Sequence, residues 1–163
     1  MKRIAFCFVV LTVTLVASEV PVVQRIEDAI RAAEPGWQCQ HAVLDAPPPV
    51  VPSEKWLVAS VWRYTSKTGN RETVIMLISQ VESRSDAHMS LDFMHEQSMH
   101  EGKVASGWKV KTYSLGDEAY LATNGSRYEI HFRKDRVIVR VKTDSILLAE
   151  RFAKDAEAQI SAN

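Results

Sequence analysis

The second half of the chain contains three short runs of alternating residues joined by tight turns, and no other feature limits the fold as strongly. The runs cover residues 118–123, 127–133 and 136–142. The Asn-Gly pair at 124–125 is favoured in type I′ hairpins, and a Lys-Asp pair at 134–135 provides the second turn. Strands with such short links are antiparallel neighbours. We therefore expect an antiparallel sheet.

Two more apolar runs, residues 55–65 and 72–81, are rich in β-branched and aromatic residues on both faces. Strands of this kind are typical of the centre of a covered sheet. Residues 108–113 form a shorter strand candidate, and an extended piece is expected at 38–44. The sheet should thus have about six to seven strands.

Apolar residues at helical spacing predict two to three helices around this sheet. Residues 21–33 form the first and residues 85–100 the second. A last helix presents one apolar face, made of Leu148, Phe152, Ala156 and Ile160. The expected fold class is α+β, with helices packed on an antiparallel sheet.

The N-terminus has the order of a secretory signal peptide. Lys2 and Arg3 precede an uncharged apolar stretch at 4–17, and small residues follow at the end of it. Fourteen residues reach about 21 Å as a helix, less than the ~30 Å hydrocarbon core of a membrane. Cleavage after Ser18 is therefore expected, with an uncleaved anchor or a buried first element as the alternative. A single domain, 19–163, would remain in the periplasm or be secreted, with no membrane span.

This domain has two notable local features, a proline-rich segment and a single cysteine. Residues 46–53 hold four of the six prolines and should form a stiff surface connector. Cys7 would leave with the signal peptide, so Cys39 is either buried or pairs with another chain.

Basic residues gather on the last two predicted strands. Alternation along each strand places one polar set outward: Arg127, His131, Arg133, Arg136, Arg140 and Lys142, with Glu129 among them. This basic face either keeps the sheet soluble or binds an anionic partner, such as acidic lipid, an envelope polymer or an acidic protein patch. Nucleic acid is not expected as a partner, because the chain has 20 basic and 20 acidic residues.

The predicted second helix carries a stripe of potential metal ligands: His88, Asp92, His95 and Met99. Imidazole, carboxylate and thioether groups on one helix face could bind a copper, nickel or zinc ion. The alternative is that the stripe only flanks a core-facing side made of Ala87, Leu91 and Met94. No other cofactor is indicated.

Catalytic signatures are absent from the sequence. Cys39 and His41 would share one side of a strand, as a nucleophile and its base require, but no residue that could orient the histidine is evident. We expect binding or sensing rather than catalysis. A hydrolase site assembled from distant residues stays open as an alternative.

A resemblance supports this view. Residues 115–120 (LGDEAY), residues 132–141 (FRKDRVIVRV) and the closing Ala-rich helix look like a pattern of small exported bacterial proteins and lipoproteins of unknown function. The likeness covers residues 55–161 and implies a sensor-like or binding-type α+β domain. It implies no catalytic residue, and the chain lacks a suitably placed cysteine for lipid attachment.

Overall fold

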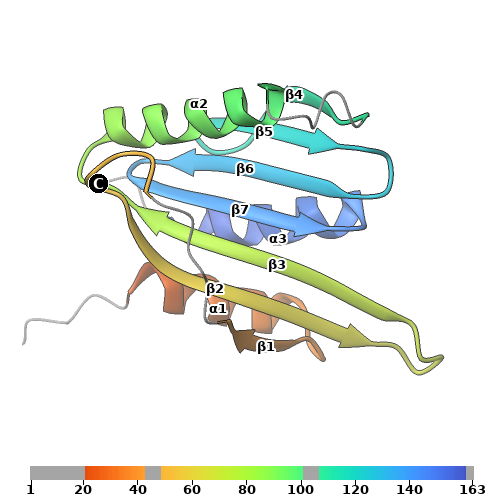
Figure 1. Ribbon diagram of the computed structural model, residues 1–163. Helices are drawn as coiled ribbons and strands as arrows, with labels where there is room; N and C mark the ends of the chain where they lie inside the picture. The colour runs from red at the N-terminus through yellow and green to blue at the C-terminus, as the bar shows by residue number, and fades with distance from the viewer. Residues whose placement is uncertain (1–20, 43–48, 101–106, 161–163) are drawn as a thin grey trace, which may run out of the picture.

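The computed structural model describes residues 21–42, 49–100 and 107–160. Seven strands form one antiparallel sheet in the order β1-β2-β3-β7-β6-β5-β4 (Figure 1). The strands are β1 (Gln38–His41), β2 (Lys55–Thr65), β3 (Arg71–Gln80), β4 (Lys109–Tyr113), β5 (Glu118–Thr123), β6 (Tyr128–Lys134) and β7 (Val137–Thr143). The helices are α1 (Val22–Ala33), α2 (Arg84–His100) and α3 (Ile146–Ala158). The expected α+β class is confirmed.

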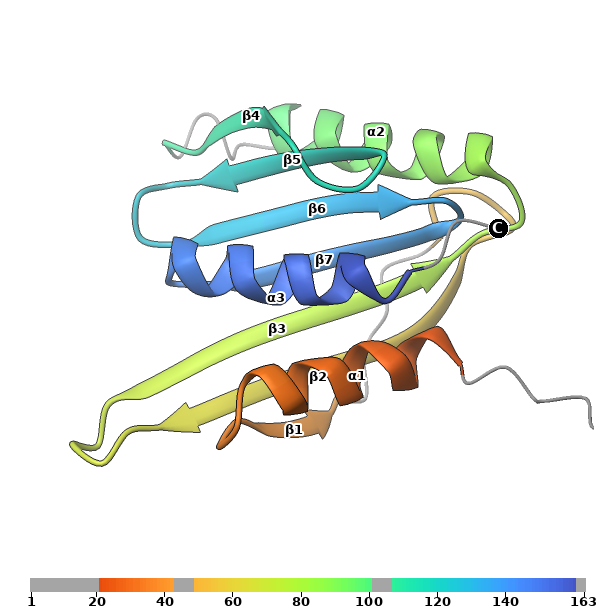
Figure 2. The same ribbon diagram turned by 180° about the vertical axis from the view of Figure 1, so that it is seen from behind.

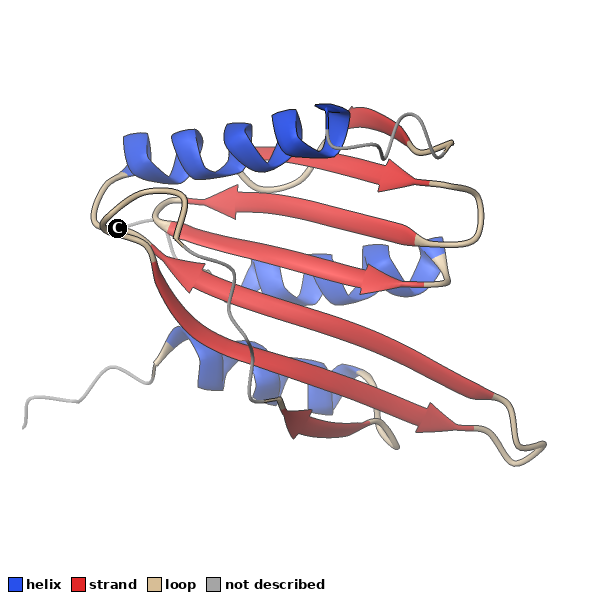
Figure 3. Cartoon of the chain, viewed as in Figure 1, coloured by secondary structure: helices blue, strands red, loops and turns tan. Residues whose placement is uncertain are grey.

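The helices cover both faces of the sheet. Helices α1 and α3 lie on one face, as the rear view shows most clearly (Figure 2), and α2 lies on the other, over the β4–β6 side (Figure 1). The colouring by secondary structure makes the three layers visible (Figure 3). No helix in the described ranges is both long and apolar enough to span a membrane.

Strands β2 and β3 lie inside the sheet, as expected, but the expected cover on both faces is incomplete. Helix α2 lies over β4–β6, and Leu57 of β2 and Ile75 of β3 are 39% and 38% exposed. The inward residues of β2 and β3 pack with α1 and α3 in the larger core, in which Trp62 and Phe152 are fully buried. A smaller core lies under α2 and contains Ala87, Leu91 and Ile138. These two cores hold the helices against the two faces of the sheet, and the candidate sites lie on those faces.

The turns differ from expectation in detail. The loop between β5 and β6 has four residues, because Thr123 pairs with Tyr128. Gly125 has a positive φ but Asn124 does not, so the expected type I′ turn is wrong. Asn124 instead accepts hydrogen bonds from the backbone of Ser126 and Arg127 through its side-chain oxygen. A polar loop held by its own side chain replaces the tighter turn.

Some expectations fall on residues outside the description. These are the signal peptide at 1–18 and residues 46–48 of the proline-rich connector. The rest of the connector, residues 49–53, contains neither helix nor strand, as its prolines require.

Candidate functional sites

The strand register sets the arrangement of the basic face. On the α2-facing side of the sheet, Lys142 of β7 pairs with Glu129 of β6, and Arg140 pairs with His131. Glu118 of β5 pairs with Arg133 in the same way. The predicted cations therefore share a face, but the register also places carboxylates beside them.

Three of these cations have acidic partners. Arg133 Nε donates to Glu118 Oε2 at 2.9 Å, and Arg136 Nε lies 3.5 Å from Asp135 Oδ2. Lys142 Nζ lies 3.7 Å from Glu129 Oε1. The sequence suggested Glu129 as the single offsetting charge, whereas the fold brings in three more carboxylates, Asp117, Glu118 and Asp135.

His131 is buried rather than outward-facing. Its side chain is 8% exposed and its ring nitrogen lies 3.2 Å from Glu129 Oε2. Burial lowers the pKa of His131, against the opposing effect of Glu129, so the ring is neutral at pH 7. The expectation of an exposed cation at this position is wrong, because the α2 layer covers this part of the face.

The remaining two arginines differ from one another. Arg140 is half-buried with its guanidinium over the ring of Trp56, 5.1 Å from the centroid, and its Nε has no hydrogen-bond partner among the described residues. Arg127 is exposed in the loop just before β6, and its guanidinium makes no ion pair within the part of the chain described. Arg127 is therefore the cation of this face that is most open to a partner.

Arg127 lies beside a surface hollow of about 410 Å³. The hollow lies where β6 begins and β7 ends, and Lys142 and Ile75 also line it. Ile75 is 38% exposed there. Two carboxylates, Glu129 and Asp144, line it as well, and Asp144 is exposed. The two cations beside an exposed apolar side chain suit a ligand with both anionic and apolar parts.

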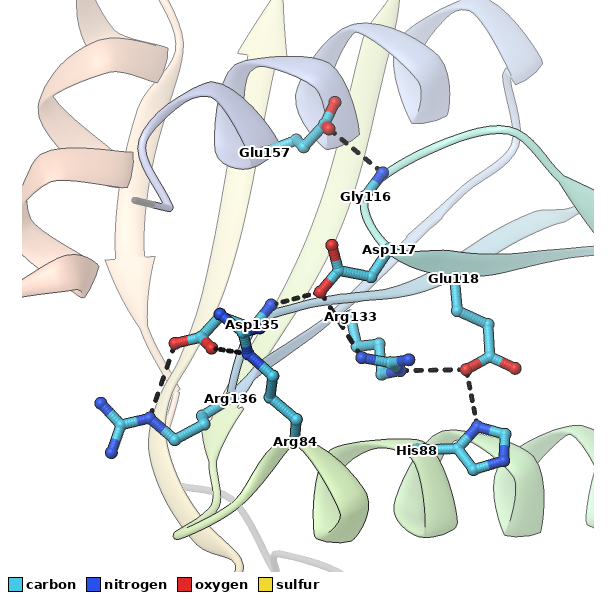
Figure 4. Close-up of polar contacts among 9 residues, drawn as sticks. All are labelled: Arg84, His88, Gly116, Asp117, Glu118, Arg133, Asp135, Arg136 and Glu157. Carbon is cyan, nitrogen blue, oxygen red and sulfur yellow. Dashed lines mark hydrogen bonds and ion pairs between the residues drawn. The ribbon is translucent and has the colours of Figure 1, made fainter. Parts of the chain in front are cut away.

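The residues of the exported-protein resemblance form a network at the opposite end of β6 (Figure 4). Asp117 accepts the backbone N–H of Asp135 at 2.7 Å, and the N–H of Asp117 donates to the carbonyl of Arg133 at 2.9 Å. Gly116 donates its N–H to Glu157 of α3 at 3.1 Å. These contacts tie the turn before β5 to the β6–β7 turn.

The same network anchors α2 (Figure 4). Arg84 Nε donates to Asp135 at 2.6 Å, and His88 Nδ1 lies 2.8 Å from Glu118 Oε2. Burial raises the pKa of Glu118, but the contacts from His88, Arg133 and Tyr120 outweigh it, and the pKa is lowered. We conclude that these motif residues hold the fold together, with every carboxylate already engaged.

The histidine stripe on α2 is partnered by the sheet. His88 contacts Glu118, and His95 stacks on Tyr120 with ring centroids 4.0 Å apart. Within the described residues, His88, Asp92 and His95 do not form a group of three donors close enough for one ion. The side chain of Met99 lies outside the described part. Ala87, Leu91 and Met94 are buried beneath the helix, as the alternative interpretation of the stripe expected.

A different cluster forms between α1 and β1. Glu27 Oε1 lies 2.7 Å from His41 Nε2 and 4.0 Å from Cys39 Sγ. Cys39 and His41 point to the same side of β1, because they are two residues apart on the strand. Glu27 supplies the partner for His41 that the sequence did not reveal. One signal was present: Glu27 follows Val23 by four residues, on the face of α1 that packs inward.

This Glu27 cluster is poorly suited to a cysteine nucleophile. Burial and the Glu27 carboxylate raise the pKa of Cys39, although Arg31 and Ser60 oppose the shift. A raised pKa leaves the thiol protonated near neutral pH, whereas catalytic cysteines are poised as thiolates.

No protein-family profile, curated protein or solved structure matches the chain.

Proposed function

We propose that this chain is an exported binding or sensor-like domain that contacts an anionic component of the cell envelope through the hollow beside Arg127. The observation that carries the proposal is that Arg127 lacks the carboxylate partner that most of the other cations of this face have. Arg133, Arg136 and Lys142 have carboxylate partners, while the Arg127 guanidinium is exposed without one in the described residues. An unpaired surface arginine can bind an anion without first losing an internal ion pair.

The position of the hollow adds to this argument. Its lining joins Arg127 and Lys142 to Ile75 and Tyr128, so a charged head group and an apolar segment could be accommodated together. Two carboxylates also line the hollow. Glu129 is 8% exposed and is engaged by Lys142 and His131, whereas Asp144 is exposed and accepts a hydrogen bond from the Thr143 hydroxyl. An acidic lipid surface is the anionic component that best fits this mixture.

Sedimentation with lipid vesicles tests the proposal. The purified chain should bind vesicles that contain phosphatidylglycerol and not vesicles of phosphatidylcholine alone, and added salt should weaken binding. Arg127→Glu should weaken binding by at least about fivefold, since one basic residue near an anionic membrane contributes roughly 1 kcal/mol. Mass spectrometry of the protein from its host should show Glu19 as the first residue if the export signal is cleaved after Ser18.

Lys67→Glu is the matched control, because it makes the same charge change in the exposed β2–β3 turn. Binding of the control should stay near the wild-type value. Equal losses for both variants, or equal binding to both kinds of vesicle, would show that the hollow has no specific role.

A further inference from the structure

We propose that Glu27, Cys39 and His41 form a binding site for a divalent transition-metal ion, with zinc as the ion that fits best. The three donor atoms, Glu27 Oε1, Cys39 Sγ and His41 Nε2, all lie within 4.8 Å of one another. The proposal concerns the α1–β1 edge of the sheet and is independent of the function assigned to the hollow beside Arg127.

The spacing of these atoms is close to that of a metal site. Tetrahedral bonds of about 2.0–2.3 Å to oxygen, nitrogen and sulfur imply donor–donor distances of roughly 3.3–3.6 Å. The observed 2.7 Å between His41 and Glu27 would lengthen, and the 4.0 Å between Cys39 and Glu27 would shorten. Small side-chain rotations on α1 and β1 are enough for both changes.

The chemistry of the donors selects the ion. Thiolate, imidazole and carboxylate are the three ligand types that zinc accepts together, whereas magnesium and calcium require oxygen ligands. Binding of the ion would release the Cys39 thiol proton to solvent. The resulting thiolate and the Glu27 carboxylate would neutralise the two positive charges of the ion. Arg31, which also contacts Glu27, is balanced by Asp28 at 3.1 Å, so the site would contain no uncompensated charge.

Groups around the cluster already orient one ligand. Arg31 Nη2 lies 3.2 Å from Glu27 Oε2, which holds the carboxylate with its other oxygen directed at Cys39 and His41. Outer contacts of this kind are typical of ligating carboxylates in metal sites.

The exposure of the site permits entry and leaves room for a further ligand. The Glu27 side chain is only 5% exposed, but that of His41 is 61% exposed. Three protein ligands with one side open to solvent leave the fourth position of a tetrahedral ion to water. The buried carboxylate provides the fixed part of the site, and His41 lies at its solvent side.

Zinc titration of the full chain tests the proposal, with a phosphine reductant to keep Cys39 reduced. Calorimetry should show one zinc ion bound per chain and no binding of magnesium. Cys39→Ser and His41→Ala should each weaken zinc binding by more than the roughly 100-fold that loss of an outer contact can cost. Cobalt should give a thiolate charge-transfer absorption that Cys39→Ser lacks, since that band requires a sulfur ligand.

His95→Ala is the control, because it removes a histidine of the α2 stripe and should leave zinc affinity unchanged. Zinc should raise the melting temperature of the wild type and of His95→Ala, and not that of His41→Ala. His41→Ala also removes the 2.7 Å contact with the buried Glu27 carboxylate, so the zinc-induced shift of each variant is measured from its own metal-free melting temperature. The proposal is overturned if the wild type binds no zinc at micromolar concentrations, or if His95→Ala lowers affinity while Cys39→Ser and His41→Ala do not.

Discussion

Gly116 shows how a single position can hold a turn in place. It has a φ of +60°, in the left-handed region, and an added Cβ would overlap the carbonyl oxygen of Arg133. The backbone of β6 cannot move away easily, because Asp117 N–H is bonded to that same carbonyl. Glycine at this position therefore allows two turns to touch.

We predict that Gly116→Ala lowers the free energy of unfolding by about 2–4 kcal/mol, from left-handed strain together with the clash. Gly125→Ala separates the two causes, because Gly125 has a φ of +89° and no atom lies within 4 Å of its added Cβ. That control should lose only about 1 kcal/mol, from strain alone. Urea unfolding measures both values, and equal losses would show that the contact with Arg133 is unimportant.

Residue-scale sites were only partly predictable from sequence. The pairing of Cys39 with His41 follows from their spacing on a strand, but Glu27 joins them only because α1 packs beside β1. The register confirms that alternate residues of β6 and β7 share one side of the sheet, but the charge balance of that side and the burial of His131 were not predicted. Glu118 reaches Arg133 across the sheet, and this contact depends on a register that alternation within one strand does not contain.

At the scale of elements, local patterns predicted the positions of helices and strands better than they predicted the residue-scale sites. Helix α2 appears at 84–100, close to the expected 85–100, because its apolar spacing and its start are encoded locally. The face of the sheet that α2 covers could not be inferred from this pattern. That choice buries His131 and brings His88 to Glu118, so it decides which predicted ligands are free.

The attachment of α2 to β5 should depend on pH through Glu118. The pKa of Glu118 is lowered in the folded state, so its contribution to stability is present above the ordinary carboxyl pKa of about 4.3. That contribution is lost as the pH falls through the lowered value. Glu118→Gln should therefore cost about 1–3 kcal/mol at pH 7 and flatten the loss of stability below pH 4.5.

Unfolding free energies from pH 7 to pH 2.5 measure this effect. Glu72→Gln changes an exposed carboxylate on β3 and should leave the profile of the wild type intact. A Glu118→Gln profile parallel to the wild type would mean that the contacts with His88 and Arg133 do not stabilise the charged form.

At the scale of the whole molecule, helices α1 and α3, the first and last of the described residues, meet on one face of the sheet. Helices α1 and α3 pack together, and Arg25 of α1 donates to the carbonyl of Gln159 at 3.3 Å. Glu34, just after α1, forms an ion pair with Arg151 of α3. The ring of Phe152 on α3 packs against two tryptophans from the N-terminal half of the chain. Its centroid lies 5.1 Å from that of Trp37 and 5.8 Å from that of Trp62. These contacts make it difficult for the α1 region or the α3 region to unfold alone.

We predict one cooperative unfolding transition, with coincident circular dichroism and tryptophan fluorescence curves, as expected for a single domain at 19–163. Phe152→Ala should cost about 3–5 kcal/mol, because it leaves a cavity against two tryptophans. Phe152→Leu, which should cost less, keeps the measurement possible if the alanine variant does not fold. Leu147→Ala on the same helix is the control and should change stability by less than about 0.5 kcal/mol, since Leu147 is 67% exposed. Separate fluorescence and dichroism transitions in the wild type would show that the α1 region and the α3 region unfold independently, despite their shared core.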